Sequence, residues 1–174
     1  MKSLRCLAVV PIYEAMTGNI CVYYGLKGEA VKQPFTVQTQ MRRFFREHRI
    51  DEKEYQKKAR RVLGIKKSLP LGFTSDCIFM PVKVRVPIAR SDGAYAYVRY
   101  EAIQDISDNQ ILLTTGEPLD CLQSRRSLAE SLARAGTIQA VLCSEEARAM
   151  AERELLRMKM QQAKKVLDDL TKYG

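Results

Sequence analysis

Residues 41–64 of this 174-residue chain read MRRFFREHRIDEKEYQKKARRVLG, and here the spacing of apolar residues changes. The preceding residues favour strands, whereas Met41, Phe44 and Phe45 recur at the spacing of a helix. Arginines surround this apolar stripe. The pattern predicts a short helix from Gln38 onward that buries its two phenylalanines and exposes its arginines.

A second helix is expected to follow over residues 51–63. Asp51 and Glu54 have the spacing of a capping box, which starts a helix, and Gly64 is suited to end it. Apolar residues fall on one side of this helix and cations on the other. The apolar side holds Tyr55, Ala59, Val62 and Leu63, and the basic side holds Lys53, Lys57 and Arg60.

Stretches typical of β-strands lie on both sides of the two helices. Turn residues such as Gly18 and Gly116 separate them at short intervals, which favours antiparallel pairing. The expected strands are 4–13, 19–26 and 30–37 before the helices, and 78–86, 94–100, 102–106, 110–114 and 119–122 after them. The fold class predicted is α+β: a β-rich domain of antiparallel strands with two short basic helices and a long C-terminal helix.

The C-terminal third is expected to contain a short helix, a strand and a long helix. Ser127 and Glu130 have capping-box spacing, and Gly136 is suited to close the short helix that they open. Residues 138–142 favour a last strand. Ser144 is a suitable N-cap for a helix that runs to about residue 172. We therefore divide the chain into a domain over 1–143 and an amphipathic helix over 144–174.

The final helix carries an apolar seam with alternating spacings of four and three residues, as in a coiled coil. The seam consists of Leu156, Met160, Ala163, Leu167 and Leu170. Two interpretations stay open, because so short a seam could pack on the chain's own sheet or could join two copies as a homodimer.

Several classes of function are disfavoured by the composition. Five scattered cysteines without a C-x-x-C pair argue against a disulfide framework and against zinc, and they suit a reducing compartment such as the cytoplasm. His48 is the only histidine, and no nucleotide-binding or hydrolase motif is present, so we expect no enzyme, metal or cofactor. No apolar run approaches the ~20 residues that span a bilayer, so no membrane partner is expected.

Positive charge is concentrated in one part of the chain. Residues 31–67 contain twelve basic and four acidic side chains, which gives +8 of the total +9. A concentrated positive field attracts polyanions, because each phosphate that it neutralises releases a condensed counterion. A solvated helix surface that only aids solubility is the alternative, although dispersed charge would serve that purpose equally well.

We predict that these cations bind double-stranded DNA. The best candidates for groove or phosphate contact are Arg42, Arg43, Arg46 and Arg49. The track is extended by Lys53, Lys57, Lys58, Arg60, Arg61, Lys66 and Lys67, with Lys83, Arg85, Arg125 and Arg126 in second rank. Phe44 and Phe45 are expected in the core, because their spacing matches the buried stripe.

The order of several short segments resembles the competence transcription factor family of ComK-type regulators, over roughly residues 9–136. The segments are Val9-Val10-Pro11, Gly18–Cys21, Arg43-Phe44-Phe45, Lys67–Leu71, Ile78-Phe79 with Pro81, and Ile111–Gly116. This resemblance implies a cytoplasmic activator of DNA-uptake genes. It further implies A/T-rich sites read from the minor groove by more than one protomer, with a proteolytic adaptor as a further candidate partner.

Other classes share parts of this pattern. Residues 94–135 also resemble a LytTR-type DNA-binding domain, which implies a regulator as well. An RNA-binding or ribosome-associated protein would have the same charge distribution, and a structural or adaptor role could act through the last helix. An enzyme would have to pair a cysteine with His48, and no cysteine is close to it in sequence.

Overall fold

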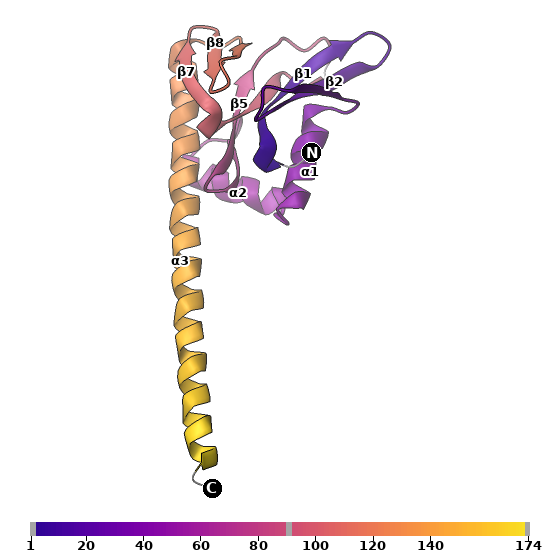
Figure 1. The fold of residues 1–174 in the computed structure, drawn as a ribbon. Coiled ribbons are helices and arrows are strands. Elements are labelled where there is room, and N and C mark those ends of the chain that lie inside the picture. Colours follow the sequence, from indigo (N-terminus) through magenta and orange to yellow (C-terminus); the bar gives the residue numbers. More distant parts are fainter. Residues whose placement is uncertain (1–2, 90–91, 173–174) are drawn as a thin grey trace.

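The computed structural model describes residues 3–89 and 92–172 and has an α+β fold (Figure 1), as the sequence predicts. One antiparallel sheet has the strand order β3-β2-β1-β6-β5-β4, and a smaller sheet has the order β7-β8-β9. The large sheet comprises β1 (Cys6–Glu14), β2 (Gly18–Gly25), β3 (Ala30–Gln33), β4 (Leu71–Thr74), β5 (Cys77–Lys83) and β6 (Tyr95–Arg99). The small sheet comprises β7 (Ile103–Ser107), β8 (Gln110–Leu113) and β9 (Pro118–Asp120).

Helices cover the large sheet on both faces. They are α1 (Val37–Glu47), α2 (Glu52–Leu63) and α3 (Arg125–Lys172), with short 3-10 turns at Ser3–Arg5 and Tyr100–Ala102. One face of the sheet packs through Val9 and Phe79 against α1 and α2. The other face packs through Met80 and Val98 against the small sheet and the start of α3. The large sheet is therefore the middle layer of three.

The two short helices form where the sequence places them. The Thr36 side chain caps α1 by accepting a hydrogen bond from the Thr39 backbone N–H. Asp51 caps α2 by accepting from the Glu54 N–H at 2.9 Å, and Gly64 ends α2 with φ of 66°. The left-handed backbone at Gly64 costs glycine little, which is why the helix ends there.

The aromatic pair of α1 lies in the core, as expected. Phe44 is fully buried and Phe45 is 3% exposed. The Phe44 ring lies 5.6 Å from the ring of Phe79, and the Phe45 ring lies 5.0 Å from that of Phe73. These edge and tilted contacts fix α1 over the sheet with its arginines facing outward.

The C-terminal third differs from the prediction. A strand over residues 138–142 is wrong, because these residues are part of α3, which runs unbroken from Arg125. Its N-terminus is held by the Ser124 hydroxyl, which accepts from the Ser127 N–H, and not by Ser127 itself. Neither Gly136 nor Ser144 interrupts the helix.

The physical reason lies in how α3 packs. Leu128, Ala135 and Ile138 recur at helical spacing and are all buried, although the last of them belongs to a short run that alone resembles a strand. Gly136 lies in the middle of the helix against Tyr100, whose hydroxyl would be 3.4 Å from an added Cβ. Here the glycine allows a close approach and does not end the helix.

Beyond Glu146, α3 projects away from both sheets (Figure 1). The seam residues on this projecting part are exposed, with values of 60% for Leu156, 66% for Met160 and 62% for Leu167. Ala163 is exposed too, and the Leu170 side chain lies outside the described residues. Of the two interpretations of the seam, packing on the chain's own sheet is therefore not observed. No helix in the described ranges is long and apolar enough to cross a membrane.

We predict that Gly72→Ala destabilises the fold. An added Cβ would lie 2.8 Å from Ile138 Cγ2 and 2.7 Å from Leu142 Cδ1, so β4 and α3 would have to separate. Overpacking of this kind costs about 1–3 kcal/mol, which should lower the urea midpoint measured by circular dichroism. Gly93→Ala is the control, because an added Cβ there meets nothing within 4 Å. Equal midpoints for the two variants would contradict this packing.

Candidate nucleic-acid interface

The arginines of α1 project from the side opposite its buried face. Arg42, Arg43 and Arg46 are all exposed, while the aromatic residues between them are buried. The Arg43 guanidinium stacks on the Phe35 ring, 3.8 Å from its centre, which holds the cation in place without neutralising it. Arg42 Nε lies 3.9 Å from a carboxylate oxygen of Glu52, so this arginine links α1 to α2.

Tyr55 fixes the orientation of α2. Its hydroxyl donates to the Pro70 carbonyl and accepts from the Gly72 N–H, both at 2.7 Å. Burial raises the pKa of Tyr55 to about 12, so the hydroxyl keeps its proton for this bond. With Tyr55 turned inward, the basic side of α2 faces solvent. Its exposed cations are Lys53, Lys57, Lys58, Arg60 and Arg61.

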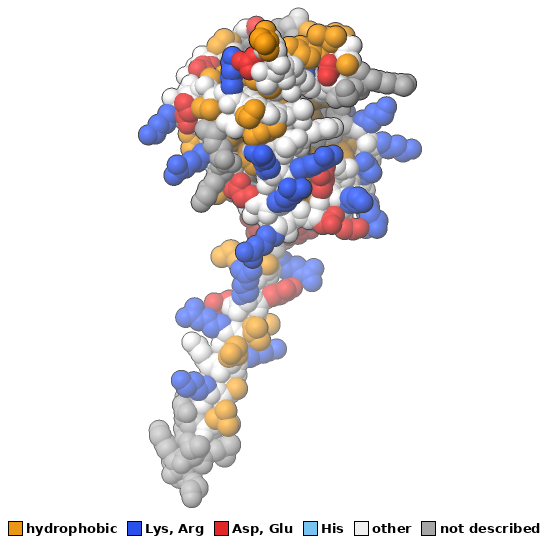
Figure 2. Space-filling view, turned by 90° about the vertical axis from the view of Figure 1, so that its right-hand side faces the viewer, with side chains coloured by type: hydrophobic (Ala, Val, Ile, Leu, Met, Phe, Trp, Pro, Cys, Tyr) orange, Lys and Arg blue, Asp and Glu red, His pale blue; other side chains and the backbone are white. Residues whose placement is uncertain are grey.

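We call the cations of α1, α2 and their connections the basic layer. It consists of Arg42, Arg43, Arg46, Arg49, Lys53, Lys57, Lys58, Arg60, Arg61, Lys66 and Lys67, all of which are exposed. The structure thus places the eleven first-choice candidates on the layer that covers one face of the large sheet. Figure 2 shows Lys and Arg side chains across the lower half of the compact part that contains the two sheets, and along the adjoining part of α3, with carboxylates interspersed.

Few carboxylates neutralise the basic layer. Arg42 has Glu52 as a distant partner, and Lys58 forms an ion pair with Glu145 of α3. Among residues 3–89 and 92–172, no other member of the layer forms a salt bridge within 4 Å. Most of these cations therefore remain available to an external anion.

The second-rank candidates lie outside the basic layer. Arg85 is only partly exposed: it donates to the Gly93 carbonyl at 2.8 Å and to Asn19 Oδ1 at 2.6 Å, and it stacks on Tyr13. These contacts give Arg85 a structural role in holding the chain between β5 and β6. Arg125 and Arg126 are exposed at the start of α3, on the opposite side of the large sheet from the basic layer. Lys83 stands directly opposite Tyr95 in the pairing of β5 with β6.

The chain's only histidine is partly buried and contacts Ser3. Ser3 Oγ is 2.6 Å from His48 Nε2, and the imidazole stacks on Phe73. Ser3 is fully buried, and so is the neighbouring Cys77, whose pKa is raised by burial to about 11. A protonated, enclosed thiol is a poor nucleophile. In the described part of the chain, no cluster of three His, Cys, Asp or Glu side chains could hold a metal ion.

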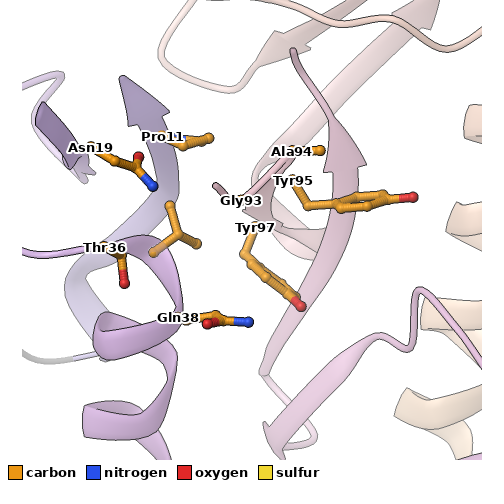
Figure 3. A pocket seen from close by; sticks show the side chains of 9 residues that line it. Pro11, Asn19, Thr36, Gln38, Gly93, Ala94, Tyr95 and Tyr97 are labelled. Carbon is orange, nitrogen blue, oxygen red and sulfur yellow. The ribbon is translucent and has the colours of Figure 1, made fainter. Parts of the chain in front are cut away.

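Two neighbouring hollows lie on the face of the large sheet that α1 and α2 cover, and the sequence gives no signal for them. One, of about 120 Å³, lies between the start of α1 and β6 and includes Thr36, Gln38 and Pro11 (Figure 3). The other, of about 200 Å³, lies between α2 and β6 and includes Arg60 and Lys66. Both hollows share Tyr95 and Tyr97, and we call them together the tyrosine trench.

The two tyrosines of the trench point in different directions. Figure 3 shows Tyr97 pointing toward Gln38, while the Tyr95 ring points away from α1. Burial, and secondarily the carboxylate of Glu52, raise the pKa of Tyr97 to about 12. Its hydroxyl therefore stays neutral at physiological pH. Because α1, α2 and β6 are distant in sequence, only the folded chain brings these residues together.

Comparison of the chain with protein-family models, with curated proteins and with solved structures gives no match. What the protein does is therefore inferred from its charge and geometry.

We predict that Arg85→Met lowers stability but leaves nucleic-acid binding intact. The substitution removes hydrogen bonds from a charged donor, each of which contributes about 1.5–3 kcal/mol. The melting temperature should fall, while the salt dependence of DNA binding should not change. The control is Arg126→Met, because the Arg126 side chain is 90% exposed and should not affect the melting temperature. A normal melting temperature with weakened binding would return Arg85 to the DNA-contacting residues.

Proposed function

We propose that the protein is a DNA-binding transcription regulator that grips duplex DNA through the basic layer. The observation that carries this proposal is that most cations of the layer are exposed and lack carboxylate partners among the described residues. Arginine forks suit phosphates because they donate two parallel hydrogen bonds, and arginines also enter narrow A/T-rich minor grooves. Such a regulator would work in the cytoplasm, beside the DNA.

The resemblance to ComK-type regulators supports a more specific proposal. In that proposal the protein binds A/T-rich sites and activates DNA-uptake genes. The backbone phosphates supply most of the affinity, and Arg42, Arg43, Arg46 and Arg49 are the candidates for the groove. Structured RNA is the competing ligand, since it presents the same phosphate charge.

Binding should depend steeply on salt. If six cations of the layer meet phosphates, the logarithm of affinity should fall against the logarithm of salt concentration with a slope of about −5. In Arg46→Glu/Lys57→Glu the slope should become less negative by about 2, because two contacts are lost. Electrophoretic mobility shifts with an A/T-rich duplex across a salt series measure both slopes.

The matched control is Lys27→Glu/Arg126→Glu, which changes the net charge equally, and both of its residues are exposed outside the basic layer. It should retain the slope of the unmodified protein. If both double variants lose binding equally, net charge and not this surface accounts for affinity. Competition with structured RNA is the second readout, and an RNA that displaces the duplex at lower concentration would move the protein to the RNA-binding class.

We also propose that the exposed seam of α3 joins two copies of the chain. A single helix that projects without tertiary contacts is marginally stable in water, so an exposed apolar seam favours a partner. Heptad numbering puts Met160 at position a and Leu156 at position d, which makes Glu152 a g residue and Arg157 an e residue. In a parallel pair, Glu152 of one copy faces Arg157 of the other, whereas the next g and e positions bring Lys159 opposite Lys164.

We expect Met160→Lys/Leu167→Lys to convert a dimer to a monomer, because two ammonium groups would enter the seam on each copy. Sedimentation equilibrium over a range of concentrations gives the masses. Leu155→Lys/Met158→Lys is the matched control: both residues are exposed on α3 at about half their surface but lie off the seam. The seam assignment would fail if the control dissociated as readily, or if the unmodified protein were monomeric throughout.

A further inference from the structure

We propose that the tyrosine trench binds unpaired bases of a nucleic acid, beside the duplex held by the basic layer. This inference rests on the proposed function, because the basic layer supplies the phosphate contacts along one edge of the trench. It adds a preference for nucleic acid that contains a short unpaired stretch.

The floor of the trench is aromatic: Tyr95 is its accessible ring, and Tyr97 is partly buried against the core. Tyr95 and Tyr97 are two residues apart on β6, so their side chains leave the same face of the sheet about 6.6 Å apart. Tyr95 is 37% exposed. Within the described ranges, no hydrogen bond engages either hydroxyl. Aromatic rings on a sheet surface are stacking platforms for bases, and they tolerate any sequence because every base has a π-face.

The edge of the trench is basic. Arg60 and Lys66 border the hollow beside α2. Lys83 pairs with Tyr95 in register, so its side chain lies on the same face of the sheet. An aromatic floor with cations along one edge complements a single strand, whose bases and phosphates lie on opposite sides.

The trench is sized for bases and not for a duplex. Hollows of about 120 and 200 Å³ can admit one or two bases. Bases would reach the trench only where the duplex is open. Pyrimidine–purine steps such as TA unstack easily, so an A/T-rich site lowers the cost of opening the duplex, and a bulge removes most of it.

Three fluorescent oligonucleotides of one A/T-rich sequence test the proposal: a full duplex, a duplex with a central two-nucleotide bulge, and a single strand. Fluorescence anisotropy gives the affinity for each. The unmodified protein should bind the bulged duplex roughly tenfold more tightly than the full duplex, because stacking contributes about 1–3 kcal/mol per base. Equal affinities for the two duplexes would overturn the proposal.

Substitution separates the trench from the basic layer. Tyr95→Leu and Tyr97→Leu should abolish the preference for the bulge and leave affinity for the full duplex unchanged. Tyr24→Leu is the control: Tyr24 is a partly buried tyrosine packed on the opposite face of the same sheet. Loss of the preference in the control, or an equal loss with all three probes in the trench variants, would overturn the assignment.

A spectroscopic reporter locates the bases directly. The chain contains no tryptophan, so Tyr95→Trp introduces a single tryptophan, which can be excited separately from the tyrosines. Its emission should be quenched by the bulged duplex and not by the full duplex, and Tyr24→Trp should not respond to either. Quenching by a free mononucleotide at the same concentration would overturn the proposal in favour of a small-molecule site.

The two proposals fail in different ways. Suppose that the protein binds the single strand and the bulge but not the full duplex, and that Tyr95→Leu abolishes that binding. The proposal that the trench binds unpaired bases is then supported, and the proposal that the basic layer binds duplex DNA is contradicted. If the full duplex binds with the expected salt slope but the bulge gives no preference, the duplex-binding proposal is supported and the trench proposal is contradicted.

Discussion

The large sheet is apolar on both of its faces, and the rest of the structure follows from covering them. Six consecutive residues of β1 and six of β5 are buried, so neither strand has a side that tolerates water. Burial of such strands removes apolar area on both sides and requires two further layers. One is built from α1 and α2, and the other from the small sheet and the start of α3. Each short helix buries its apolar side against the sheet, so its cations lie on the opposite, solvent-exposed side.

The layers are joined where β4 meets both α2 and α3. Gly72 lets α3 approach closely, and its N–H binds the Tyr55 hydroxyl of α2. The ion pair between Lys58 and Glu145 links the same two helices at the surface. The basic layer is thus held against α3 at Glu145, just before the helix projects away from the sheets. If two copies pair along that helix, their basic layers acquire a fixed relative position, which allows two half-sites to be bound at a defined spacing.

The sequence predicted what local pattern determines and missed what depends on distant contacts. The caps of α2, the burial of Phe44 and Phe45 and the α+β class follow from spacing. The strand expected at 138–142 failed because a five-residue apolar run is compatible with strand or helix, and burial on β4 decides between them. The role of Arg85 depends on Asn19 and Tyr13, which precede it by more than sixty residues. The trench was equally hidden, because β6 supplies its floor and two earlier helices its walls.

Exposed cations can be concentrated on one layer because water and dissolved ions screen most of the electrostatic repulsion between them. Charges in water are screened over about 8 Å at physiological ionic strength, so their mutual repulsion weakens the fold only slightly. A partly buried guanidinium is different: Arg85 is surrounded by acceptors and an aromatic ring, and its Nη1 still lacks a partner among the described residues. Arg99 is a second example: its side chain is 13% exposed, and it donates to the Leu4 and Asp76 carbonyls. The arginines of the basic layer, by contrast, stay hydrated. Hydrated cations retain their full charge for phosphates, and the counterions that phosphates release provide the free energy of binding.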